Sequence, residues 1–214
     1  MPELQIIGGS ASNFVWVTRI ACAEKGVPYA LVAARPHTPE VEAIHPFGKI
    51  PAMRHGDVTL CESRAICAYI DRAFDGPPLI SRDPVVAAQV EQWISIICTH
   101  IDPLWFRQYL AAYIFPGTAD GSPDRVRIEA ALPKMVPQFE VMNRAVGKTG
   151  HLVGETFTLA DAYLMPILFY MRTRPESSAL LGKSPHLTAY LDRHVARKSV
   201  HDAIPQTLPG STPR

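Results

Sequence analysis

The spacing of apolar residues changes near Gly76–Pro78, and this change most limits the folds open to the chain. Before it, short apolar runs alternate with amphipathic helical stretches, whereas after it only the helical period remains. A Gly-Pro-Pro stretch cannot continue a helix and is typical of a linker. A chain of 214 residues can bury two small cores. We therefore expect a mixed α/β domain over residues 1–76 and an all-helical domain over residues 84–214.

The first domain is predicted to hold a strand–helix–strand unit, followed by a hairpin and a helix. The first apolar run ends at Gly8, and Gly26 stands where the first helix would end. The strand–helix–strand unit requires a right-handed parallel crossover. The predicted strands and helices span residues 3–7, 13–25, 29–33, 52–54, 58–61 and 63–74. This order predicts an open mixed sheet covered by helices.

The second domain shows no strand pattern. Its first helix has a long apolar stripe at helical spacing, formed by Val86, Val90, Trp93, Ile94, Ile97 and Ile101. Further helices are predicted near residues 105–115, 123–146, 158–172 and 184–197. Thr158 and Asp161 have the spacing of a capping box at the start of one of them.

The overall charge argues against two classes of partner. The formal net charge is +1, whereas nucleic acids and anionic membranes require concentrated basic surface. No apolar run approaches the roughly 18–20 residues of a membrane span, and no signal-peptide pattern is visible at the N-terminus. We expect a cytoplasmic protein without nucleic-acid or membrane partners.

The metal-binding residue types are scattered. The chain has four cysteines and eight histidines, without CxxC, HxxxH or mixed clusters at metal spacing. The cysteines are therefore predicted to be buried thiols, and no metal site is expected.

Three short stretches of the first domain have residues and positions that are typical of binding or catalytic sites. Ser10-Ala11-Ser12 stands between the first strand and the first helix, where backbone N–H groups and the helix dipole stabilise an anion such as a thiolate. The alternative is that Ser12 only caps the helix. A redox role would require a cysteine at this turn, and none is present.

The second and third stretches flank the predicted hairpin. A cis Ile50–Pro51 bond would leave the backbone of Ile50 free to pair with an extended peptide. Glu62 and Ser63 begin a helix, where they could hold the ammonium and carboxylate groups of an amino acid. The alternative for this pair is an ordinary helix start.

Together, these stretches resemble the glutathione S-transferase superfamily, in its serine-type (bacterial theta/phi/zeta-like) form. The resemblance is carried by SNFVWVTRIACAEKG (12–26), HPFGKIPAM (45–53) and LCESRAICAYI (60–70), and by TLAD (158–161) in the helical half. It implies a thioredoxin-like βαβαββα domain followed by an all-helical domain, with glutathione as co-substrate and no metal. It also implies a homodimer.

The resemblance assigns roles to particular residues. Ser12, with Ser10 as the fallback, would donate a hydrogen bond to the glutathione sulfur and favour the thiolate. The implied glutathione-binding residues are Lys49, Ile50, Pro51, Glu62, Ser63 and, less directly, His37. The implied second-substrate pocket consists of Phe14, Trp105, Tyr109 and Tyr113, with polar contacts from Asp102 and Arg107. These aromatics could equally be core residues.

The function implied is transfer of glutathione to a small, hydrophobic electrophile. Within enzymes, the alternative is a glutathione-dependent isomerase or dehalogenase. Outside them, it is a non-catalytic ligand carrier or interaction scaffold, although a scaffold would not need an intact peptide clamp. The proline-containing tail at 205–214 is expected to be loose or draped over the surface.

Overall fold

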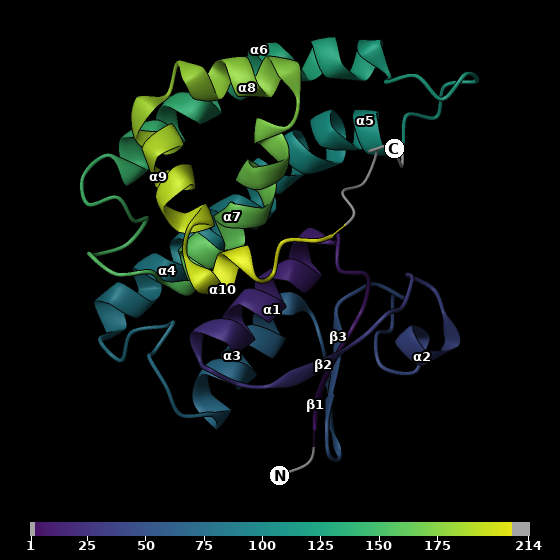
Figure 1. Cartoon of the computed structure of the whole chain (residues 1–214), viewed down its shortest axis with the longest axis vertical. Helices are drawn as coiled ribbons and strands as arrows, with labels where there is room; N and C mark the ends of the chain where they lie inside the picture. Colours follow the sequence, from purple (N-terminus) through teal and green to yellow (C-terminus); the bar gives the residue numbers. More distant parts are fainter. Residues whose placement is uncertain (1–2, 207–214) are drawn as a thin grey trace.

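The computed structural model describes residues 3–206, so most of the tail considered above lies outside the described residues. The sheet occupies one end of the molecule and a group of helices the other (Figure 1). No helix among the described residues is long and apolar enough to cross a membrane.

The sheet has four strands in the order β2-β1-β3-β4. Strand β1 pairs in parallel with β2 and antiparallel with β3, and β3 pairs antiparallel with β4. The predicted mixed sheet is therefore confirmed. The elements of this end are β1 (Leu4–Ile7), α1 (Asn13–Glu24), β2 (Tyr29–Val32), α2 (Pro39–Glu42), β3 (Ala52–His55), β4 (Val58–Cys61) and α3 (Ser63–Ala73).

Both faces of the sheet are covered. Successive side chains of a strand point to opposite faces, and each set packs against helices. Ile6 and its partner Met53 belong to the large core that includes α1 and α3. The next pair, Ile7 and Ala52, packs on the opposite face with Val41 of α2. The short helix α2 agrees with the βαβαββα order that the resemblance implied, although the residue pattern alone left this segment irregular, since four residues give little helical pattern.

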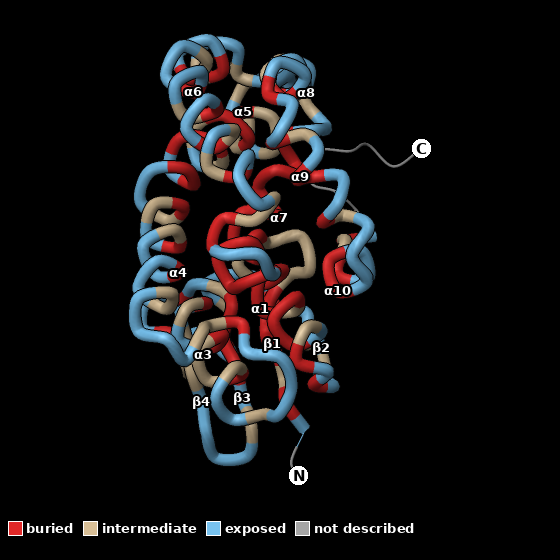
Figure 2. Tube along the Cα trace, turned by 90° about the vertical axis from the view of Figure 1, so that its left-hand side faces the viewer, coloured by how far each residue is buried: buried red, intermediate tan, exposed pale blue. Residues whose placement is uncertain are grey.

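Helix α1 lies at the junction of the two ends of the molecule and is mostly buried (Figure 2). It packs on α3 of the sheet domain and on α7 (Leu159–Arg172) of the helical domain. Trp16 of α1 is fully buried between rings of α7, with centroids 5.2 Å from Phe169 and 5.9 Å from Tyr170. The helical domain therefore fixes the helix that carries the first predicted site residue at its N-terminus.

The rest of the helical domain contains more elements than the sequence predicted. They are α4 (Pro84–Ile96), η1 (Ile97–Leu110), α5 (Ala111–Ile114), α6 (Arg125–Val146), α8 (Pro175–Gly182), α9 (Pro185–Val195) and α10 (Lys198–His201). Helices α8 and α10 are short and were missed. The capping box is confirmed, because the Thr158 N–H donates to the Asp161 carboxylate over 2.8 Å.

The main difference from the prediction is η1, a π-helix that continues directly from α4. The sequence predicted two α-helices separated near Pro103. Instead, Pro103 lies inside η1, as Pro133 and Pro137 lie inside the α-helix α6. A π-helical stretch of 14 residues is rare.

Candidate active site

A cavity of about 870 Å³ lies between the sheet domain and the helical domain. Its sheet-domain wall includes Ser12, Ile50, Pro51, Glu62 and Ser63, which the sequence singled out from three separate stretches. Because the resemblance implies that glutathione binds there, we call this wall the glutathione half. The opposite wall comes mainly from α4, η1 and the α5 end, and we call it the acceptor half.

Ser12 is the N-cap residue of α1, with an extended backbone (φ −71°, ψ 129°). Its carbonyl accepts the first helical hydrogen bond, from the N–H of Trp16 over 2.9 Å, but its side chain makes no capping bond. The Tyr170 hydroxyl donates to the carbonyl of Ala11 over 2.8 Å and so ties this turn to α7. The Ser12 hydroxyl is therefore available to a ligand at a helix N-terminus.

Ile50–Pro51 is a cis peptide bond, as the family resemblance implied, whereas the local sequence alone favoured a trans bond. The turn after β1 approaches it closely at Gly8 (φ 152°), where an added Cβ would lie 2.6 Å from Val15 and 3.1 Å from Ile50. Only glycine allows this approach without a shift. The turn that carries Ser12 and the cis peptide are consequently held side by side.

Glu62 and Ser63 are fixed in different ways. Glu62 has φ 67°, an unusual conformation for a non-glycine residue and a form of local strain that concentrates at binding sites. Ser63 begins α3, and its hydroxyl lies 2.8 Å from the hydroxyl of Tyr163 on α7. The Ser63 N–H, at the N-terminus of an eleven-residue helix, points to an anion-binding role.

A buried histidine that the sequence analysis did not single out supports Glu62. His45 is 2% exposed, and its Nδ1 accepts a hydrogen bond from the N–H of Phe47 over 3.1 Å. That bond places the ring proton on Nε2, which lies 3.4 Å from the Glu62 carboxylate. His45 thus helps to orient a carboxylate whose side chain is otherwise 69% exposed.

Of the other residues predicted to act on glutathione, only some line the cavity. Lys49 lines the cavity, but His37 and Ser10 do not. His37 is 70% exposed, sits against Gly48 and has its Nδ1 3.5 Å from the Glu42 carboxylate. Arg35, which the sequence analysis passed over, lines the cavity at the end of β2.

The acceptor half combines aromatic and aliphatic groups with the cation Arg107 and with polar residues of α4 and η1, namely Glu91, Ser95 and Thr99. Phe14, the one predicted pocket aromatic at the cavity, lines it together with Phe106, Ile114 and Phe115. The guanidinium of Arg107 lies over the rings of Phe14 and Phe106, 5.9 and 5.8 Å from their centroids.

The other three predicted pocket aromatics do not line the cavity. Trp105 is fully buried and stacks on Phe139 of α6, with ring centroids 4.4 Å apart. The hydroxyl of Tyr109 donates to Glu176 of α8 over 3.0 Å, and the hydroxyl of Tyr113 donates to the same carboxylate. Their spacing does place them on one side of the helix, but that side faces α6 and α8, because the core between these helices requires large rings.

The four cysteines are free thiols, but only two are buried as predicted. Burial raises the pKa of Cys22 to about 12, so this thiol is inert at neutral pH. Cys98 is half-buried and lines the cavity, where burial and the neighbouring Asp102 and Glu62 raise its pKa to about 11. Among the described residues, the cavity lining therefore offers no thiol that is ionised at neutral pH.

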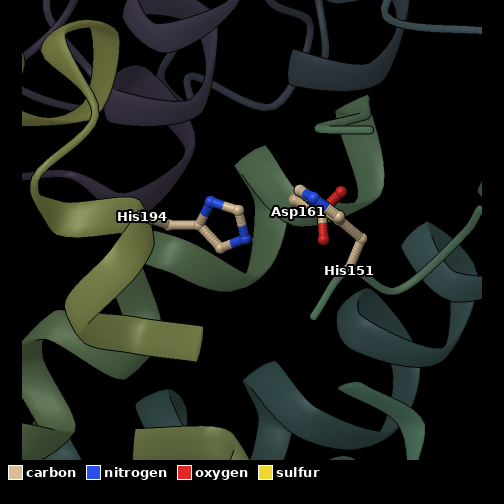
Figure 3. A group of neighbouring side chains, drawn as sticks. All are labelled: His151, Asp161 and His194. Atoms are coloured by element: carbon tan, nitrogen blue, oxygen red, sulfur yellow. The ribbon is translucent and has the colours of Figure 1, made fainter. Parts of the chain in front are cut away.

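A second group of titratable side chains, His151, Asp161 and His194, lies in the helical domain (Figure 3). One ligand atom from each lies within 4.8 Å of the others, a set that the sequence spacing did not reveal. Asp161, however, already accepts hydrogen bonds on both oxygens, from the N–H of Leu152, the N–H and hydroxyl of Thr158 and the hydroxyl of Tyr190. With its oxygens so occupied, the carboxylate ties the start of α7 to α9, which is a structural role.

Comparisons with known proteins agree with this geometry. Family models for the glutathione S-transferase N-terminal and C-terminal domains match residues 7–78 and 125–193. The chain is 32% identical to Glutathione S-transferase F13 of Arabidopsis thaliana, over 77% of this chain and 75% of that protein. It is 30% identical to Glutathione S-transferase 3 of Zea mays over 99% of each.

A solved structure of glutathione S-transferase I from maize, in complex with an atrazine glutathione conjugate, is similar to this fold. Its TM-score is 0.83 at 26% identity, covering 94% of this chain and 96% of that one. The chain therefore belongs to the glutathione S-transferase family. The predicted fold class, a thioredoxin-like domain followed by a helical domain, is confirmed.

Proposed function

We propose that this glutathione transferase is of the serine type, with Ser12 donating a hydrogen bond to the glutathione sulfur. The observation that carries the proposal is that the Ser12 side chain makes no capping hydrogen bond at the N-terminus of α1. Ser12 lines the same cavity as cis-Pro51, Glu62 and Ser63. A hydrogen bond to the charged form favours the thiolate, and each unit of pKa depression corresponds to ~1.4 kcal/mol. A thiol with pKa near 8.5 would then be largely ionised at neutral pH after a shift of about two units.

Glutathione would bind along the glutathione half in an extended form. Ile50 would pair with its cysteinyl backbone beside cis-Pro51, as an added strand does at a sheet edge. Glu62 and the N–H of Ser63 would hold the γ-glutamyl ammonium and carboxylate. Lys49 and Arg35, both at the cavity, would bind the glycine carboxylate, with His37 less suited because its side chain lies outside the cavity wall.

The bound thiolate would attack a small electrophile held by the acceptor half. The aromatic and aliphatic part of that lining, formed by Phe14, Phe106, Ile114 and Phe115, suits an apolar body. In this arrangement residues 1–76 supply the glutathione site, and residues 84–214 supply most of the acceptor site. The homodimer and the cytoplasmic location stay predictions.

The test compares wild type with Ser12→Ala and Ser10→Ala, using glutathione and a reactive aryl halide. We expect Ser12→Ala to lower kcat by about 100-fold, the usual loss when one preorganised donor to a developing anion is removed. Glutathione affinity, measured by calorimetry, should change little in either variant. Full activity in Ser12→Ala would refute the assignment, and a loss confined to Ser10→Ala would transfer the role to that residue.

A further inference from the structure

Helix α7 contacts both helix N-termini of the glutathione half through tyrosine hydroxyls. The hydroxyl of Tyr163 lies 2.8 Å from the Ser63 hydroxyl at the start of α3. The hydroxyl of Tyr170 donates to the carbonyl of Ala11, one residue before the N-cap of α1, over 2.8 Å. The two tyrosines are 2% and 1% exposed. A phenylalanine would fill either space without a polar atom, so the two hydroxyls point to a role beyond packing.

The two tyrosines stand on one face of α7. They are seven positions apart, which is about two helical turns and about 10 Å along the helix axis. An extended tripeptide covers a similar length, at about 3.3–3.6 Å per residue. This spacing suits a ligand whose thiol lies near Ser12 and whose γ-glutamyl carboxylate lies near Ser63.

At Ser63 the tyrosine hydroxyl can support a bound carboxylate. A serine hydroxyl has a single proton to donate and two lone pairs that accept. A phenol is the stronger donor of the two hydroxyls, and burial raises the pKa of Tyr163 well above its usual value, so the phenol keeps its proton. With a carboxylate at the start of α3, Ser63 donates to that carboxylate and accepts from Tyr163. Two hydrogen bonds in a chain strengthen each other, and the one to the carboxylate gains.

At Ala11 the contact acts on the turn that carries Ser12. Tyr170 packs on Trp16 of α1, with ring centroids 5.9 Å apart. Its hydroxyl donates to the carbonyl of the Ala11–Ser12 peptide, and the N–H of that peptide donates to the carbonyl of Gly9 over 3.0 Å. Both sides of this peptide unit are held, so the turn is in place before a ligand binds. A donor that needs no rearrangement stabilises an anion more effectively.

We propose that Tyr163 and Tyr170 are positioning residues for glutathione, with separate tasks. Tyr163 strengthens the hold of Ser63 on the γ-glutamyl carboxylate. Tyr170 aligns Ser12 with the sulfur. This inference rests on the proposed function, since it requires glutathione along the glutathione half. Each tyrosine acts through a serine, so removal of one hydroxyl changes one property of the bound ligand and leaves the other.

The test replaces each tyrosine by phenylalanine, which removes the hydroxyl and keeps the ring. Affinity is measured by calorimetry with S-methylglutathione, because this ligand cannot ionise at sulfur. The pKa of the bound glutathione thiol is measured by ultraviolet difference spectroscopy. We expect Tyr163→Phe to raise the Kd for S-methylglutathione about 3- to 10-fold and to leave the thiol pKa at its wild-type value. Tyr170→Phe should raise the thiol pKa by about 0.5–1 and leave the Kd within about twofold of wild type.

Tyr190→Phe is the matched control. Tyr190 is also buried, and its hydroxyl donates to Asp161 over 2.9 Å, away from the cavity lining. Its loss should lower the free energy of unfolding in urea, as the loss of either α7 hydroxyl does. The Kd for S-methylglutathione and the thiol pKa should both match wild type. A general loosening of the helical domain would instead change both quantities in all three variants.

Two further measurements test the path through Ser63. Ser63→Ala should raise the Kd for S-methylglutathione, and adding Tyr163→Phe should raise it little further, because residues that act as a unit are not additive. A glutathione analogue without the γ-glutamyl α-carboxylate should bind wild type and Tyr163→Phe equally.

The possible results distinguish the two proposals. Wild-type values in both tyrosine variants, or equal changes of Kd and thiol pKa in both, would overturn the separate tasks. Additive effects of Ser63→Ala and Tyr163→Phe would also overturn the role of Tyr163. If wild type neither binds S-methylglutathione nor lowers the thiol pKa, the proposed function itself fails.

Discussion

The two halves of the cavity are built on different principles. The glutathione half depends on backbone features, namely a cis peptide, two helix N-termini and a glycine that permits close approach. The acceptor half depends on side chains that project from a π-helix and its flanking turns. We infer that the first half fixes the nucleophile, whereas the second half can vary and so sets the electrophile.

The largest effect is expected from a variant that tests whether a buried aromatic of η1 belongs to the core or to the acceptor half. Trp105→Ala removes a fully buried ring stacked on Phe139, so the free energy of unfolding should fall by about 3–5 kcal/mol. Urea unfolding measures this loss. The ratio of rates for two electrophiles should stay near that of wild type, and a changed preference would show that Trp105 acts on the acceptor after all.

Glu62→Gln tests the glutathione half. Loss of the charge that we propose to face the ligand ammonium should cost about 1.5–3 kcal/mol, or roughly 10- to 100-fold in the KM for glutathione. The preference among electrophiles should not change. Glu40→Gln, in the exposed part of α2, is the control and should match wild type. A changed electrophile preference in Glu62→Gln would mean that the halves are not separable.

Acid should weaken the helical domain through a buried histidine. Burial lowers the pKa of His194 to about 4, against about 6.5 in an unfolded chain. The unfolded state therefore binds more protons between these values, so this contribution to stability is complete above about pH 6.5 and is lost as the pH falls toward 4.

Urea unfolding at pH 7 and pH 5 measures this dependence. His194→Gln should lose less stability between the two conditions than wild type does. His186→Gln, at an exposed position of α9, should behave like wild type. Equal pH dependence in all three proteins would contradict the assignment.

Phe115→Ala tests the acceptor half with the smallest expected effect. Phe115 is 68% exposed and lines the cavity. Removing its ring should therefore change the free energy of unfolding little, but an apolar substrate would lose a contact that shields it from water. We expect the KM for benzyl chloride to rise about three- to tenfold, and the KM for glutathione to stay constant. Steady-state kinetics with each substrate varied in turn measures both KM values. An equal rise in both would contradict the separation of the two halves.

The parts of the fold and site that follow local rules could be predicted from the sequence. Ser12 before an amphipathic helix, Pro51 before a strand and the Thr158–Asp161 box each depend on neighbouring residues, and the structure places each as expected. The acceptor half could not be predicted in this way. The direction of Trp105 depends on Phe139 of α6, and the spacing of apolar residues does not distinguish the π-helix η1 from an α-helix.

The most direct test of the central claim is ultraviolet difference spectroscopy of bound glutathione across pH, with wild type and Ser12→Ala. We predict a thiolate band in wild type that appears about two pH units below the pKa of free glutathione, and a return of that pKa toward the free value in the variant. An equally low thiol pKa in both proteins, or bound glutathione that does not ionise in wild type, would contradict the role of Ser12.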